Sequence, residues 1–198
     1  MSRIRANTIT NKAATGAPTF SNGAVVTGVC TATSFAGSGA ALTGISAGLF
    51  SSYAILTHEK ANNTHGSGFG TGSYVTRELN TEVADPDGIV SVSGNHFTLQ
   101  AGSYLIESMS IIHRGNPSQS RLYNVTDSSV VQYGMSVHSS DGNSGNVLSP
   151  VVARVTIGSA KAFRIESRVT NSDGENSGLA NNFGNTQIYS IIKIFKEN

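Results

Sequence analysis

The sequence predicts an all-β protein, and three observations lead to that prediction. Charged residues make up only 13% of the 198 residues, whereas Ser, Thr, Asn and Gly supply 28, 18, 17 and 22 residues. An average soluble domain carries about 25% charged residues, so this composition is unusually rich in turn-forming residues. Apolar residues recur with a period of two between turn signals, and no stretch shows helical periodicity.

The segment Asn95–His113 contains the strand pair around which we build the fold. Phe97 and Leu99 alternate with polar residues, a turn follows at residues 101–103, and apolar residues then continue on both sides of the chain to Ile112. Such a strand is typical of the centre of a sheet. We expect both of its faces to be dry, with Tyr104, Ile106 and Ile112 on one face and Leu105, Met109 and Ile111 on the other.

Strand and turn signals alternate through the rest of the region 51–198, which we call the head. Phe163, Ile165 and Val169 alternate with Arg164, Glu166 and Arg168, and this alternation predicts one buried and one solvated face. We expect eight to ten strands at the spacing of a β-sandwich. Beyond the pair above, the expected strands cover residues 51–59, 79–83, 89–92, 121–125, 130–137, 147–157, 162–170 and 187–195.

Residues 1–50 differ from the head, because their small apolar residues are interrupted by Gly and Thr every few positions. Such a segment cannot close a core alone, and its short β-prone runs, 24–26 and 29–35, favour strands completed by neighbouring chains. A disordered linker is the alternative. This segment carries Arg3, Arg5 and Lys12 and no acidic residue. We therefore divide the chain into residues 1–50 and 51–198.

Several function classes are disfavoured. A formal net charge of +1 does not suit nucleic-acid binding, and no apolar run approaches the roughly 20 residues that cross a bilayer. The five His residues and Cys30 lack the spacing of metal ligands. Gly44-Ile45-Ser46-Ala47-Gly48 matches a nucleophile elbow but is not followed by a helical pattern. We predict no enzyme activity, no catalytic residues, no cofactor and no metal site.

The start of the chain shows no signal-peptide pattern. We therefore expect synthesis in the cytoplasm. The stretch Ala6–Ser46, with its order NGAVVTGVCTATSFAGSGAALTGIS, resembles N-terminal segments of structural and fibre proteins of tailed bacteriophages, especially marine cyanophages. This resemblance implies a virion protein whose N-terminal segment docks on another virion protein, with Arg3, Arg5 and Lys12 as anchor residues.

The head resembles the trimeric jelly-roll family that includes the globular head of complement's first component and tumour necrosis factor. Phe97 before the turn, Gly102-Ser103-Tyr104 after it and the closing apolar strand Ile188–Phe195 carry this resemblance, while Ile106 stands where the family has an aromatic residue. The resemblance implies a jelly-roll β-sandwich and a homotrimer. It also leaves open whether an ion lies on the threefold axis.

Together these features predict a virion fibre with an N-terminal anchor and β-shaft and a C-terminal knob that attaches to a host-surface glycan or another receptor. Loops rich in Asn, Ser, Asp and Gly offer adaptable hydrogen bonds to hydroxylated ligands. Phe69, in a Gly-rich loop, is either a further contact or part of the core. The alternatives are a capsid or tail decoration protein without receptor binding and, less favoured, a polysaccharide depolymerase. The expected receptor-binding residues are Phe183, Asn181, Asn182, His113, Arg114 and Gln119.

Overall fold

The computed structural model describes residues 9–16, 19–20, 22–31, 48–139 and 145–198. The chain divides into two units, Met1–Gly44 and Ile45–Asn198, and the second contains the head. Within the described ranges there is no helix long and apolar enough to cross a membrane. All the strands found in these ranges belong to the second unit.

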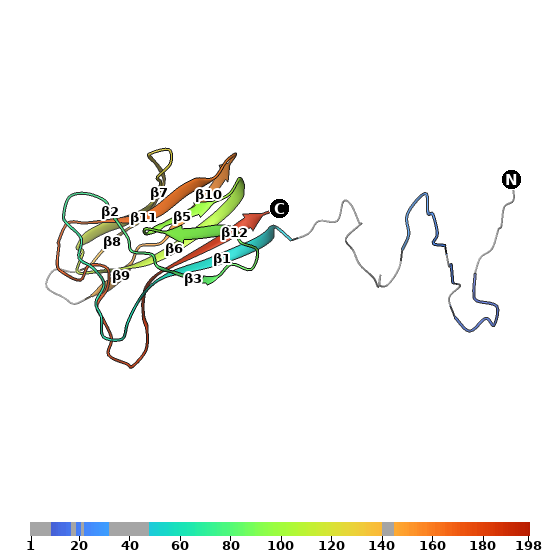
Figure 1. Cartoon of the computed structure of the whole chain (residues 1–198), viewed down its shortest axis with the longest axis horizontal. Coiled ribbons are helices and arrows are strands. Elements are labelled where there is room, and N and C mark those ends of the chain that lie inside the picture. The colour runs from blue at the N-terminus through green and yellow to red at the C-terminus, as the bar shows by residue number, and fades with distance from the viewer. Residues whose placement is uncertain (1–8, 17–18, 21, 32–47, 140–144) are drawn as a thin grey trace. The chain divides into compact units, whose positions relative to one another are not determined.

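The head is built from two antiparallel sheets that lie against each other (Figure 1). The first sheet has the order β10-β6-β12-β1-β3, with β9 also paired to β6, and the second has the order β4-β5-β11-β7-β8, with β2 paired to β11. The predicted all-β fold class is confirmed. The strands are β1 (Phe50–Lys60), β2 (Val75–Thr76), β3 (Thr81–Ala84), β4 (Val90–Ser93), β5 (His96–Leu99), β6 (Gly102–His113), β7 (Pro117–Asn124), β8 (Ser129–His138), β9 (Asn146–Leu148), β10 (Val151–Ile157), β11 (Lys161–Val169) and β12 (Gln187–Glu197).

The hydrophobic core fills the space between the inner faces of the two sheets. Leu56 and Ile194 from the first sheet and Phe97 and Phe163 from the second are completely buried. The rings of Phe97 and Phe163, on paired strands, stack with centroids 5.8 Å apart. Burying each such side chain stabilises the fold by roughly 1.5–3 kcal/mol.

Strand β6 lies between β10 and β12, as expected for the centre of the first sheet. Its inner face is dry, because Tyr104, Ile106 and Ile112 are at most 1% exposed. The prediction that its outer face is also dry is wrong for a single chain: Leu105 and Ile111 are half-buried, and Met109 is 37% exposed. The reason is that Met109 and outward residues of the neighbouring strands, such as Tyr53, remain partly open to solvent in a single chain.

Some predicted strands differ in detail. The segment 147–157 is two strands, because β9 ends before Ser149 and Pro150 and β10 begins after them; Pro lacks the N–H that a continuous ladder needs. The two residues of β2 are too few to give a periodic signal. Glu166, expected on a wet face, is only 2% exposed because two arginines enclose it.

The two ends of the head are different. Phe50 pairs with Glu197 and Lys60 with Gln187, so β1 carries the chain from the end that holds the C-terminus to the opposite end (Figure 1). At this opposite end lie the loops that follow β1, β6 and β11. We call it the loop end and define it as residues 61–74, 113–117 and 170–186. Backbone hydrogen bonds join these loops to one another.

The first unit, described by itself, forms no strand in its described residues. A local turn occurs at residues 11–16, where the Thr15 amide donates to the Asn11 side chain at 2.9 Å. Val25 and Val29, in the runs predicted to be β-prone, are 94% and 91% exposed. Residues 32–46, the second part of the stretch that resembles phage fibre segments, lie outside the described residues. The ordering of this unit by neighbouring chains stays a prediction.

Candidate binding surface at the loop end

Backbone contacts make the loop end one connected structure. The Gly66 amide donates to the Gly178 carbonyl at 2.9 Å, which joins the loop after β1 to the loop before β12. The His113 amide donates to the Asn176 carbonyl at 2.9 Å, and the Thr170 amide donates to the Gly115 carbonyl at 3.1 Å. The three loops therefore present a common surface to one side of the head.

The buried Arg77 connects the loop end to strands β6 and β12. Arg77 is 2% exposed, and its Nη1 donates to the Ile111 carbonyl at 2.9 Å. Its Nη2 donates to the carbonyls of Ser177 and Tyr189, both at 3.3 Å. Burial lowers the pKa of Arg77 to about 10, so the guanidinium remains charged at neutral pH. One side chain thus satisfies backbone acceptors from three parts of the chain.

Phe69 lies above this guanidinium, with its ring centroid 5.1 Å from the Arg77 Cζ atom. The Phe69 side chain is 3% exposed and packs with Ile112 and Val169 in a small second core. Of the two roles considered from the sequence, Phe69 therefore takes the structural one. It is not available to contact a ligand in this conformation.

A second buried polar cluster lies where β1 ends. His58 is completely buried, and its Nε2 is 2.6 Å from Glu78 Oε2, which is also 2.8 Å from Lys60 Nζ. Burial is the main reason that the pKa of His58 falls to about 4, outweighing the attraction of Glu78. Burial raises the pKa of Glu78, but hydrogen bonds from Lys60 and Ser67 and the nearby positive charge outweigh it and lower the pKa. His58 is therefore neutral at pH 7.

Phe183 is the most exposed aromatic side chain of the described part of the head, at 81%. Its loop is held in place by Asn62, whose amide donates to Asn182 Oδ1 at 2.9 Å and whose Oδ1 accepts from the Gly184 amide at 2.9 Å. The Asn181 amide donates to Gln187 Oε1 at 2.7 Å. The structure therefore brings three predicted binding residues, Asn181, Asn182 and Phe183, together on one exposed and anchored loop.

A shallow pocket of about 150 Å³ lies beside this loop. Its lining includes the apolar residues Phe183, Ile111 and Ile188 and the polar residues Asn181 and Asn185. Apolar walls with a few amide groups are suited to a ligand that has both C–H and hydroxyl groups.

The other predicted receptor-binding residues lie elsewhere. His113 is 1% exposed, with Nδ1 2.9 Å from Asn146 Oδ1 and Nε2 3.9 Å from Asp173 Oδ2, so the expectation that it contacts a ligand does not fit this structure. Arg114 is exposed, 4.0 Å from the Asp173 carboxylate. Gln119 lies on β7 in the second sheet, where Tyr74 Oη donates to its Oε1 at 2.8 Å.

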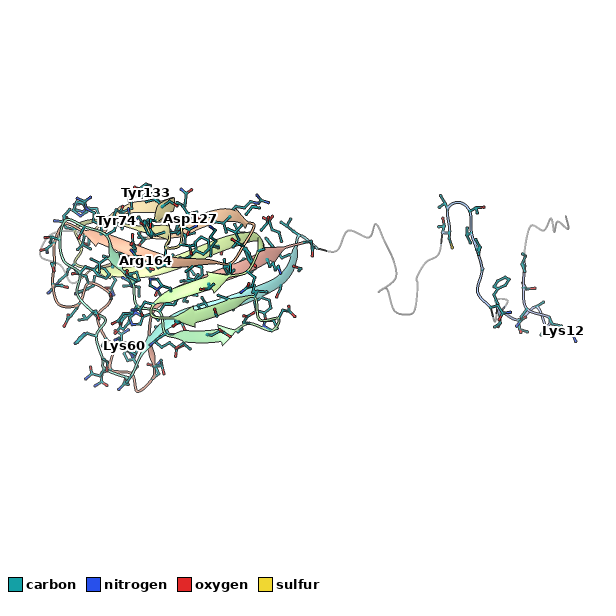
Figure 2. The ribbon with its side chains drawn as sticks, turned by 45° about the horizontal axis from the view of Figure 1, so that its top comes forward. Lys12, Lys60, Tyr74, Asp127, Tyr133 and Arg164 are labelled. Atoms are coloured by element: carbon teal, nitrogen blue, oxygen red, sulfur yellow. The ribbon has the colours of Figure 1, made fainter. Side chains whose placement is uncertain are left out.

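Of the predicted anchor residues, Lys12 is exposed in the turn at residues 11–16 and is labelled in Figure 2, whereas Arg3 and Arg5 lie outside the described residues. Most of the elbow-like motif, residues 44–47, is also outside them. Docking through this segment stays a prediction.

Among the described residues, no group of three or more His, Cys, Asp or Glu side chains could hold a metal ion. The sequence Asp85-Pro86-Asp87-Gly88 resembles the start of a calcium-binding loop. In the structure, the Asp85 carboxylate accepts hydrogen bonds from the backbone amides of Ile89 and Val90 at 2.9 and 3.0 Å. Residues 85–88 therefore form a turn stabilised by its own aspartate.

Comparison with solved structures places these strands in a known architecture. The chain is similar to the Eiger tumour necrosis factor of S. frugiperda, with 13% identity and a TM-score of 0.51 over 74% of this chain and 92% of that one. The head has a jelly-roll fold. Other similar structures are the globular domain of zebrafish complement 1qA (14% identity, TM-score 0.46, covering 74% of this chain and 98% of that one) and murine APRIL (8%, 0.46, 73% and 98%). No protein-family model and no curated protein matches the chain.

Proposed function

We propose that this protein is a homotrimeric virion fibre of a tailed phage, anchored by residues 1–50 and binding a host-surface glycan through the loop end of its jelly-roll head. The single observation that supports self-association best is the uncovered apolar face of the first sheet. The proposal that the protein is a virion protein rests on the sequence of residues 6–46.

The outer face of the first sheet carries rows of apolar side chains across three strands. One row pairs Tyr53 with Phe195 and Leu105, and another joins Ile191 to Met109. Tyr53 is 45% and Met109 37% exposed. Between the two rows, Lys193 Nζ lies 3.2 Å from Glu107 Oε2, so the charges of the intervening row neutralise each other. Two apolar rows separated by a neutralised ion pair form a face that favours protein contact.

A second apolar group lies on β8, at the edge of the second sheet. Tyr133 and Met135 on this strand are 50% and 64% exposed. Two different apolar patches on one chain suit a head-to-tail interface, in which one patch of each copy packs on the other patch of the next copy. Such an arrangement closes into a ring when the rotation between successive copies permits it, and the ring of three is the one we propose.

The loop end supports the attachment part of the proposal. It lies at the opposite end of the head from Phe50, the first residue of β1 (Figure 1). In the fibre that we propose, the loop end faces the host. Phe183 offers an exposed ring for the face of a sugar, and neighbouring asparagines offer hydrogen bonds to its hydroxyls. Three weak sites on one rigid knob gain useful avidity even if each binds in roughly the millimolar range.

Self-association is tested by light scattering of the full chain, whose single-copy mass is 20.5 kDa. We expect the mass of three copies at micromolar concentration. Met109→Glu places a charge on the apolar face and should give single copies. Ser91→Glu adds the same charge to an exposed position on the second sheet and should leave the trimer intact. A parent protein that remains a monomer would refute the trimer.

Attachment is tested by binding of the labelled full chain to an array of bacterial surface polysaccharides. Phe183→Ala should reduce binding by at least about tenfold. Phe20→Ala is the control, because it removes an exposed phenylalanine that lies in the first unit, and it should leave binding unchanged. If the Phe183 variant remains folded and binds like the parent, the loop surface is not adhesive. The decoration protein without receptor binding would then become the better proposal.

A further inference from the structure

A second, larger pocket of about 260 Å³ lies on the second sheet, and the proposed attachment site does not include it. It is formed where β7 begins and where β8 and β11 end, close to the loop end. Tyr74, Pro117 and Val137 supply its apolar walls, and Ser118 and Arg168 supply polar groups. Gln119, Ser136 and Thr170 complete the polar lining.

The wall formed by Tyr74 is held rigidly. The Arg121 guanidinium carbon is 3.9 Å from the centroid of the Tyr74 ring, and the Tyr133 ring lies 6.1 Å away on the same side of the head (Figure 2). Burial raises the pKa of Tyr74, so its hydroxyl stays protonated and donates to Gln119. Gln119 in turn donates to the Gly134 carbonyl at 3.0 Å. The pocket is therefore preformed.

The charge beside the pocket is positive and only partly neutralised. The carboxylate of Glu166 is shared by Arg121 and Arg164, each at 2.5 Å. Arg168, the next outward residue on β11, is exposed and forms no ion pair with any described residue. No carboxylate lines the pocket. A guanidinium in this position can bind a carboxylate through two parallel hydrogen bonds.

Two exposed hydroxyl side chains line the same pocket. They belong to Ser136, on β8, and Thr170, which follows β11. Ser136 Oγ accepts a hydrogen bond from Gln119 Nε2 at 3.2 Å, which holds it in position. A hydroxyl can donate or accept, and it therefore suits the hydroxyl groups of a sugar.

We propose that this pocket binds one acidic monosaccharide unit, with its carboxylate on Arg168 and a ring hydroxyl on Ser136. The pocket is smaller than the roughly 300–1,000 Å³ of sites for drug-sized ligands, so it takes one ring. Tyr74, Pro117 and Val137 contact the C–H face of that ring. This site differs from the Phe183 pocket in position and in ligand chemistry, so it stands whether or not that pocket binds glycan.

The test uses the full chain and D-glucuronate as the probe, with saturation-transfer NMR and titration to obtain dissociation constants. We expect binding in the millimolar range, and at least about tenfold weaker binding of D-glucose, which lacks the carboxylate, and of acetate, which lacks the ring. Equal binding of acetate would overturn the sugar proposal, because any acidic group, including that of a peptide, would then suffice. Equal binding of glucose would exclude the role of Arg168.

Variants separate binding from folding. Arg168→Gln should weaken glucuronate binding by at least about tenfold. Ser136→Ala should weaken it several-fold without lowering the melting temperature, because Ser136 is exposed. Ser91→Ala, which removes an exposed hydroxyl elsewhere on the second sheet, and Phe183→Ala should leave it unchanged. Unaltered binding by both pocket variants, or no binding by the parent, would refute the site.

Discussion

The buried His58 makes a specific prediction about pH. Its pKa is about 4 in the folded chain, against 6.5 for an ordinary histidine. The unfolded chain therefore takes up a proton at this residue at a higher pH than the folded chain does. The stability that neutral His58 contributes is complete above about pH 6.5 and is lost progressively as the pH falls toward 4.

The size of the effect follows from the same pKa values. One pKa unit corresponds to about 1.4 kcal/mol. Between pH 7 and pH 5 the unfolded chain takes up more protons at this residue than the folded chain does, and this lowers the free energy of unfolding by about 2 kcal/mol. Glu78 and Lys60, which contact or lie next to the imidazole, are partly exposed to solvent, and screening reduces the effect. We expect the free energy of unfolding to fall by about 1 to 2 kcal/mol.

The measurement is urea unfolding of the full chain at pH 7 and pH 5, at one protein concentration because association also affects stability. His58→Gln keeps a polar side chain that does not titrate, so its stability should change less between the two pH values than that of the parent. His138→Gln removes an exposed histidine and should retain the parent's loss. If the His58 variant loses as much stability as the parent, another group causes the acid sensitivity.

Three further predictions concern the fold. Ile106→Ala, on the dry face of β6, should lower the free energy of unfolding by about 2–5 kcal/mol in urea titrations; a smaller loss would mean that water reaches this face. Arg77→Met leaves three carbonyls without their donor and should cost at least about 2 kcal/mol, seen first as faster hydrogen exchange of the Gly66 and Gly178 amides; unchanged exchange would show that the guanidinium does not hold the loops. A head beginning at Gly48 should fold and associate like the full chain in light scattering, and an insoluble or monomeric product would mean that residues 1–47 drive assembly.

Most strands of the head could be predicted from sequence because they carry their own periodic pattern between turn residues, whereas the two residues of β2 could not. The inner face of β6 follows from the spacing of Tyr104, Ile106 and Ile112. The state of its outer face does not, since apolar residues at Leu105, Met109 and Ile111 are equally compatible with a second protein layer from the same chain or from another copy. The pattern records that a face is apolar but does not identify what covers it.

The candidate binding surfaces could be predicted only in part. The exposed loop around Phe183 was accessible to sequence reasoning, because turn-forming residues surround a lone aromatic residue. The burial of His113 depends on contacts with Asn146 and Asn176, which lie 33 and 63 positions later in the chain. The pocket at Arg168 likewise takes its lining from separate strands, and no local pattern marks residues that meet only after both sheets have formed.

The way in which Arg77 holds the loop end bears on how this surface can change over generations. Its guanidinium donates hydrogen bonds to the main-chain carbonyls of residues 111, 177 and 189, and every amino acid has such a carbonyl. Substitutions in the outward side chains of these loops therefore leave the hydrogen bonds of Arg77 in place. A lineage can therefore change the side chains that the loop end presents one residue at a time, while the fold of these loops stays the same.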